Sequence, residues 1–160
     1  MYDAKKQDIY LNKYVSFHRT VKKVVSMATI IFSSTGLISW LTTNGNSLFT
    51  GIALSLSVIS KLIELFQSQI IASDEYLSDV SELRMLCIDY YNHVQSIFID
   101  LRIKKTDQHT AWERYGQHIN LKNKIEEKLG NTKIWIFNYI NKSSNLETTN
   151  YMARYYEQTK

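Results

Sequence analysis

The chain has 160 residues, about the length of one domain, and its lack of proline means that little interrupts a helix. Its single cysteine, Cys87, excludes an internal disulfide. The net charge of +4 is concentrated near the start, where residues 1–23 carry six basic and two acidic side chains. This placement suits attraction to anionic lipid headgroups, and direct nucleic-acid binding is not expected.

The most unusual stretch covers residues 24–60, which contain no Asp, Glu, Lys or Arg. A helix of about 20 apolar residues can cross the roughly 30 Å of hydrocarbon in a bilayer. The stretch predicts two transmembrane helices, about 24–43 and 48–66, joined by a turn at 44–47. The flanking basic residues place both termini in the cytoplasm, with the protein multi-pass in the bacterial inner membrane. The alternative is a buried hairpin inside a soluble helical domain.

Small and hydroxyl-bearing residues recur on one face of each predicted span, where they would allow close helix packing. They are Ser26, Thr29, Ser33 and Gly36 in the first span and Thr50, Ser57 and Ser60 in the second. Two interpretations are open: the faces close the hairpin on itself, or they also meet other subunits of a homo-oligomer and line a water-filled path. The expected membrane-interface anchors are Lys22, Lys23, Trp40 and Lys61.

The predicted fold class is all-α, a two-span transmembrane hairpin that continues into a cytoplasmic helical bundle. Residues 1–23 form a basic amphipathic helix that lies on the membrane or packs on the other helices, 24–66 form the hairpin, and 67–160 form the cytoplasmic domain. In this domain apolar residues recur in alternating steps of three and four, which is typical of a coiled-coil-like seam. The seam residues are Val80, Leu83, Cys87, Tyr90, Val94, Ile97 and Leu101. Later helices of the same chain or a neighbouring subunit must cover them.

A polar turn is predicted at residues 104–108, after the seam helix. Thr106 or Asp107 is a suitable cap for the next helix, because a short side-chain oxygen can accept from free backbone amides. Gly130 is a suitable residue to end that helix. The sequence therefore predicts one helix between this turn and Gly130.

The apolar segment 134–140 has seven residues, too few to span a membrane. It is expected to dock either on the helical body or on lipid headgroups. Residues 143–145 are polar and predict a linker and cap, followed by a helix over 146–158.

No pattern of catalytic, cofactor-binding or metal-binding residues is present, and the protein is predicted to be non-enzymatic. His109 and Glu113 are four residues apart, as are Asp89 and His93, but two candidate ligands do not make a metal site. These pairs are expected to be solvated. Cys87 lies on the apolar seam and is expected to be a small core residue rather than a nucleophile.

A basic first helix, a two-span hairpin, a long acidic and apolar helix, and a further helix with Trp112 and Tyr115 together resemble the SLATT group (SMODS and SLOG-associating two-transmembrane effectors). The resemblance covers roughly residues 10–130 and is architectural. It implies a membrane effector of a bacterial antiphage system of the abortive-infection type. Such a protein would oligomerise and permeabilise or depolarise the inner membrane when a regulatory partner releases it. The alternative is a non-enzymatic membrane adaptor that recruits a cytoplasmic protein through its helical body.

Overall fold

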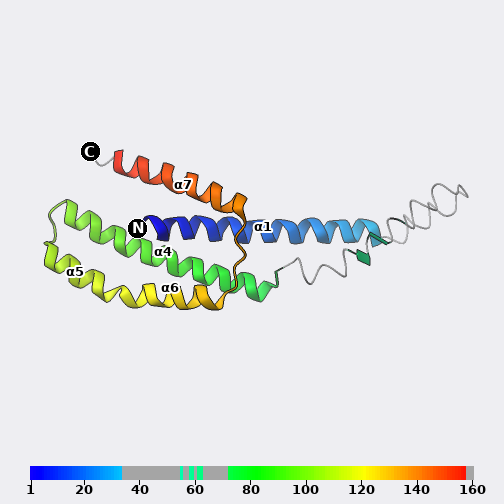
Figure 1. The fold of residues 1–160 in the computed structure, drawn as a ribbon, viewed down its shortest axis with the longest axis horizontal. Helices are drawn as coiled ribbons and strands as arrows, with labels where there is room; N and C mark the ends of the chain where they lie inside the picture. The colour runs from blue at the N-terminus through cyan, green and yellow to red at the C-terminus, as the bar shows by residue number, and fades with distance from the viewer. Residues whose placement is uncertain (34–54, 56–57, 60, 63–71, 158–160) are drawn as a thin grey trace, which may run out of the picture. The chain divides into compact units, whose positions relative to one another are not determined.

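The computed structural model describes residues 1–33, 55, 58–59, 61–62 and 72–157. Its helices are α1 (Tyr2–Ser33), α4 (Asp74–Arg102), α5 (Gln108–Gln117), α6 (Ile119–Asn131) and α7 (Asn138–Glu157) (Figure 1). The described residues contain no strand, so the all-helical part of the predicted fold class is confirmed. α4 begins at Asp74 after the non-helical residues Ala72 and Ser73, and it does not continue directly from the residues before it.

The chain divides into two compact units. One, which we call the helical body, combines Met1–Val15 with Glu75–Lys160, and the other covers Ser16–Asp74. In the helical body the start of α1 lies between α4 and α7, and α5 and α6 follow the other side of α4 (Figure 1). The first residues of the chain are therefore part of the same core as the helices after Asp74.

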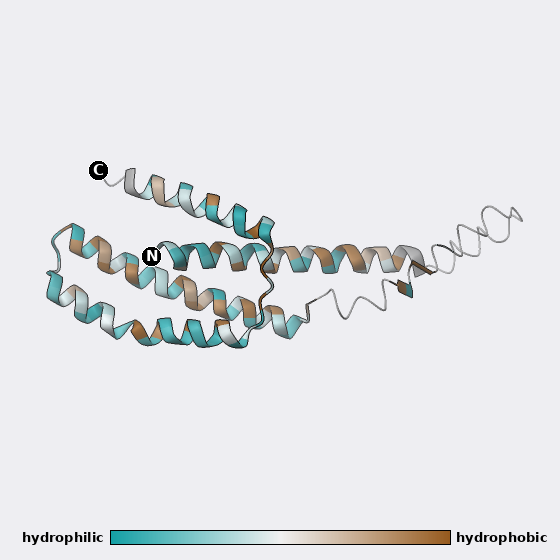
Figure 2. Cartoon of the chain, in the orientation of Figure 1, coloured by the Kyte–Doolittle hydropathy of each residue, from teal (hydrophilic) through white to brown (hydrophobic). Residues whose placement is uncertain are grey.

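The core of the helical body joins α1, α4 and α6. Its buried residues are Leu11, Tyr14, Val15, Val80, Leu83, Cys87 and Ile125. The first half of the predicted seam is thus covered by helices of the same chain, and the start of α1 packs on them. Along α4, hydrophobic and hydrophilic residues are intermixed, as expected for a helix with a buried face (Figure 2).

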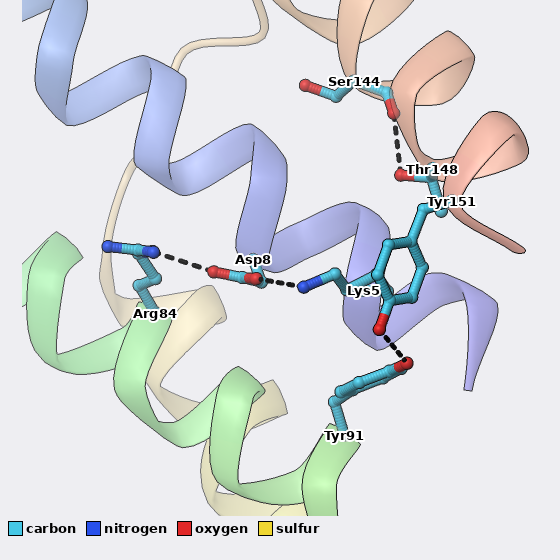
Figure 3. Close-up of polar contacts among 7 residues, drawn as sticks. All are labelled: Lys5, Asp8, Arg84, Tyr91, Ser144, Thr148 and Tyr151. Carbon is cyan, nitrogen blue, oxygen red and sulfur yellow. Dashed lines mark hydrogen bonds and ion pairs between the residues drawn. The ribbon is translucent and has the colours of Figure 1, made fainter. Parts of the chain in front are cut away.

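A polar cluster links α1 to α4 beside this core (Figure 3). The Asp8 carboxylate, only 10% exposed, accepts from Lys5 Nζ at 3.1 Å and from Arg84 Nε at 2.8 Å. The Lys5 ammonium also lies over the rings of Tyr91 and Tyr151, 5.2 Å and 4.9 Å from their centroids. The buried carboxylate therefore has two charged partners, which offset its desolvation.

Helix α7 packs on the body through small polar residues. Ser144 and Thr148 are fully buried, and their hydroxyls donate to the carbonyl oxygens of Ile140 and Ser144 at 2.8 Å and 2.7 Å (Figure 3). These bonds within the helix satisfy the hydroxyls without partners on other helices, so α7 can approach closely. The predicted linker at 143–145 is wrong, because these residues lie inside α7.

The predicted transmembrane hairpin, and with it the multi-pass inner-membrane localisation, is corrected by the structure. Among the described residues, no helix is both long enough and apolar enough to cross a membrane. Helix α1 is described as far as Ser33. Most other residues of the predicted spans 24–43 and 48–66 lie outside the described residues.

Three residues of the predicted packing face lie on α1. Ser26 is exposed, Ser33 ends the helix, and the Thr29 hydroxyl donates to the Val25 carbonyl at 2.9 Å. This bond holds the Thr29 hydroxyl against its own helix. The remaining members, Gly36, Thr50, Ser57 and Ser60, lie outside the described residues.

The predicted membrane anchors have different surroundings. Lys22 Nζ contacts both carboxylate oxygens of Asp74, at 2.6 Å and 2.7 Å, in an exposed ion pair. Lys23 and Lys61 are exposed, and Trp40 lies outside the described residues. The described contact of Lys22 is therefore with a carboxylate of its own chain.

The helix predicted between residue 107 and Gly130 is two helices, α5 and α6, that meet at His118. The His118 amide donates to the Tyr115 carbonyl at 3.0 Å, and its ring lies 4.1 Å from the ring of His93 on α4. The predicted cap at Asp107 is confirmed, because its carboxylate accepts from the Thr110 amide at 2.7 Å.

Replacing Asp107 by alanine is expected to loosen the first turn of α5. The Thr110 amide loses its acceptor, and we expect its hydrogen exchange, followed by NMR, to become about fivefold faster. Asp107→Ser keeps an acceptor oxygen and should restore most of the protection. Amide donation lowers the pKa of Asp107, so the cap should be complete above a pH of about 4 and lost as the pH falls further. Unchanged exchange in Asp107→Ala would contradict the capping role.

Candidate functional site

An apolar groove runs between the second half of α4 and helix α5. Its cavity volume is about 630 Å³. The lining residues are Val94, Ile97, Phe98 and Leu101 from α4 and Gln108, Ala111, Trp112 and Tyr115 from α5. Only Gln108 among them is not hydrophobic or aromatic, so the groove is suited to apolar side chains rather than to a charged substrate.

A tight turn brings the two walls of the groove together. Lys104 has a φ of 56°, the left-handed conformation that often ends a helix. The Lys105 amide donates to the Asp100 carbonyl at 2.9 Å and the Lys104 amide to the Leu101 carbonyl at 3.2 Å, the pattern of a Schellman motif. Both bonds satisfy carbonyls at the end of α4, and the Asp100 carbonyl also accepts from the Thr106 amide at 3.3 Å. The turn thereby fixes where α5 starts relative to α4.

An ion pair joins α4 and α5 next to the groove. Arg114 donates to the Asp100 carboxylate at 2.7 Å and to the Ser96 hydroxyl at 3.4 Å. The Asp100 pKa is lowered, first by this hydrogen bond and then by the positive charges of Lys105 and Arg114. The carboxylate is therefore ionised at neutral pH, and it holds α5 beside α4.

The groove has a buried floor and an exposed rim. Ile97 and Ala111 are 9% and 7% exposed, whereas Trp112 is 65% exposed. The Trp112 ring meets the edge of Tyr115 at 5.9 Å between centroids. Tyr115 in turn shares a hydroxyl hydrogen bond of 3.3 Å with Tyr90, and burial raises the Tyr90 pKa to about 12. Most of the Trp112 side chain is thus exposed to a partner, and its neighbour Tyr115 is held by Tyr90.

One end of the groove is basic. Arg102, Lys104 and Lys105 are exposed at the end of α4 and in the turn after it. Lys105 lies 3.9 Å from the Asp100 carboxylate, which is also bound by Arg114. Asp107, the cap of α5, is a second carboxylate in this turn. Arg102, Lys104, Lys105 and Arg114 still outnumber the two carboxylates, so the end of the groove favours negatively charged groups.

The structure divides the predicted seam between two roles. Val80, Leu83 and Cys87 belong to the core, and Tyr90 packs against it. Val94, Ile97 and Leu101 instead line the groove. The sequence indicated that these last residues need a cover, but it did not identify Phe98 as part of the same wall or Ala111 and Trp112 as the opposite wall. The pair Trp112 and Tyr115, one helical turn apart, was the sequence feature that could have indicated an aromatic wall on the second helix.

The residue pairs considered for metal binding do not form a larger cluster. Within the part of the chain that the structure describes, no group of three or more His, Cys, Asp or Glu side chains could hold a metal ion. His93 Nδ1 lies 2.7 Å from the backbone carbonyl of Asp89, and His109 and Glu113 form an exposed pair at 3.6 Å. Cys87 is buried in the core, as predicted.

No protein-family model, curated protein or solved structure matches this chain. The resemblance to the SLATT group stays a prediction from the sequence.

Proposed function

We propose that the protein is a non-enzymatic adaptor that binds an amphipathic helix of a partner protein in the groove between α4 and α5. The observation that carries the proposal is an apolar groove of about 630 Å³ with a 65% exposed tryptophan at its rim. Tryptophan is one of the residue types that contribute most to binding energy at protein interfaces. An uncovered apolar surface of this kind is a common mark of an interaction site.

The shape of the groove favours a helix as the bound element. Its α4 wall is built from Val94, Ile97, Phe98 and Leu101, and its α5 wall from residues 108 to 115. On each wall the lining residues recur every three or four positions, so each wall is one face of a helix and the two helices lie side by side. A bound helix would lay residues at positions i, i+3 or i+4, and i+7 along this surface.

The charges at the groove end define the partner further. Arg102, Lys104 and Lys105 should attract acidic residues near one end of the bound helix. Because these cations are exposed, salt should weaken their contribution. The expected partner segment is therefore amphipathic, with an apolar stripe and an acidic end.

The resemblance to the SLATT group supports a cellular role for this adaptor in bacterial antiphage defence. On this proposal the partner is a regulatory or sensor protein of the same abortive-infection system. Permeabilisation of the membrane depended on the transmembrane hairpin and is not part of the proposal. Homo-oligomerisation through the groove is the competing arrangement, and the solution mass of the chain, measured over a range of concentrations, would detect it.

Two fluorescent synthetic helices test the proposal, each of about 18 residues with the same apolar stripe and either an acidic or a basic end. We expect the full chain to bind the acidic peptide about tenfold more tightly at about 50 mM salt, measured by fluorescence anisotropy. Trp112→Ala should weaken binding of the acidic peptide by about tenfold, because the rim loses its indole. The preference between peptides should shrink at high salt.

Trp135→Ala is the matched control, since Trp135 is also exposed but does not line the groove. This variant should bind the acidic peptide as the unaltered chain does. Equal binding of both peptides, or unchanged binding by Trp112→Ala, would contradict the proposal.

A further inference from the structure

A second exposed apolar surface lies in the connection between α6 and α7 and at the start of α7. Trp135, Ile136 and Tyr139 are 76%, 75% and 85% exposed, and we call these three residues the docking patch. Their neighbours Ile134 and Phe137 pack against the core, and Ile140 is buried. The segment thus docks on the helical body with one set of side chains and presents the other set to its surroundings.

The backbone around the docking patch is held by two tyrosines of the body. The Tyr10 hydroxyl donates to the Trp135 carbonyl at 2.9 Å and accepts from the Phe137 amide at 3.2 Å. The Tyr76 hydroxyl donates to the Lys133 carbonyl at 2.9 Å. Long-range bonds of this kind fix an extended segment that lacks helical hydrogen bonds of its own. The patch is therefore presented in one orientation.

The surroundings of the docking patch are basic. Residues 130–146 contain Lys133 and Lys142 but no Asp or Glu, and both lysines are exposed. A cavity of about 330 Å³ beside Ile136 is lined in part by Lys6. Lys133 also lines a cavity with Asp79, Glu82 and Glu127, but every charged side chain of the segment 130–146 itself is a lysine. An apolar, aromatic segment with this charge is complementary to a surface that has an apolar interior and a negatively charged exterior.

We propose that the docking patch adsorbs to an anionic lipid surface, with Trp135 and Tyr139 at the level of the headgroups and Lys133 and Lys142 against lipid phosphates. Tryptophan and tyrosine favour this level because they have an apolar ring and a polar tip. Lysines close to anionic lipid add electrostatic attraction. The contact is with one face of a bilayer and involves no crossing. It uses different residues from the α4–α5 groove and does not rest on the proposed function.

Vesicle binding by the full chain tests this proposal. A variant with Trp40→Phe and Trp112→Phe leaves Trp135 as the only tryptophan. Its emission should shift to the blue with vesicles containing about 30% phosphatidylglycerol, and remain unshifted with pure phosphatidylcholine. Lys133→Gln and Lys142→Gln should each weaken binding to the anionic vesicles by about fivefold in a sedimentation assay.

Variants of the patch separate it from any other region that binds lipid. Trp135→Ala combined with Tyr139→Ala should lower the vesicle partition coefficient by about tenfold, whereas Trp112→Ala should not change it. Both patch residues are exposed, and unchanged circular dichroism would verify folding. Equal binding by all variants, or no shift of the Trp135 emission, would overturn the proposal. If the patch instead binds a protein, pure lipid vesicles will leave Trp135 unaffected.

Discussion

Asp8→Ala is expected to lower the free energy of unfolding of the helical body by about 2 to 3 kcal/mol. The substitution leaves Lys5 and Arg84 beside one another without the carboxylate that both contact, at 3.1 Å and 2.8 Å. Removing one member of a buried ion pair costs more than the pair itself contributes, because the remaining charges stay desolvated. Arg84 is 34% exposed, which keeps the expected loss below that of a fully buried pair. Urea unfolding followed by circular dichroism measures the change.

Glu126→Ala provides the control for this experiment. Glu126 lies 3.5 Å from Lys122 in an exposed pair on one helix, where such pairs contribute about 0.2 to 0.5 kcal/mol. Asp8→Asn tests the role of charge, because the amide oxygen can still accept a hydrogen bond. The free energy of unfolding of Asp8→Asn should lie between those of the unaltered chain and Asp8→Ala. A loss for Asp8→Ala no larger than that for Glu126→Ala would show that the cluster does not stabilise the fold.

Cys87 is expected to react with iodoacetamide about a thousandfold more slowly in the folded protein than after unfolding, at a pH of about 8. Burial, with a smaller contribution from the negative charge of Asp8, raises the pKa of the Cys87 thiol to about 12. An unperturbed thiol with a pKa of about 8.5 is about one quarter thiolate at this pH, whereas a thiol with a pKa of about 12 is about one ten-thousandth thiolate. Mass spectrometry of the native and denatured chain gives the two rates.

All labelling by iodoacetamide at cysteine can be assigned to Cys87, because the chain has one cysteine. A control variant with Cys87→Ala and Asn92→Cys moves the thiol to an exposed position on α4. That variant should label at similar rates in the folded and unfolded states. Rapid native labelling of Cys87 would mean that the core of α1, α4 and α6 opens frequently, contrary to the burial seen here.

Several features of the fold could be predicted because they depend on neighbours in the sequence. The helical steps from Val80 to Leu101 identified the apolar side of α4. Asp107 could be named as a cap because its side chain reaches an amide only three residues away. The burial of Cys87 followed from its place on the same side. In each case the relevant interaction lies within one helix or on one face of it.

Other features depend on contacts that no local pattern contains. Ser143 to Asn145 read as a linker because serine and asparagine favour caps, but Ser144 fits the close packing of α7 on the body. The break at His118 follows Gly116 by two residues, a signal that was not used to end the first helix there. The hairpin was inferred from the uncharged stretch 24–60, its turn and its basic flanks, but no helix of the described residues is both long and apolar enough to cross a membrane.

In the groove, the apolar residues of α4 could be predicted from the sequence, but the position of α5 beside them could not. Val94, Ile97 and Leu101 were recognised as apolar residues in need of a cover. Whether α5 would cover them fully depends on the turn at Lys104 and on the Arg114–Asp100 pair, which set the distance between two helices. The exposed position of Trp112 follows from that geometry.

The pairing of α1 with α7 also constrains how this protein can fold during synthesis. Tyr2 contacts Thr149 at 3.3 Å between hydroxyl oxygens, and Lys13 contacts Glu147 at 2.6 Å. These partners are separated by most of the chain, so a ribosome must translate nearly all of it before the first helix can find its final neighbours. Distant pairings of this kind form after the local contacts of the chain. Leu11, Tyr14 and Val15 of α1 can pack on α4 once α4 has been made, whereas the side of α1 that faces α7 stays uncovered until the last helix is complete.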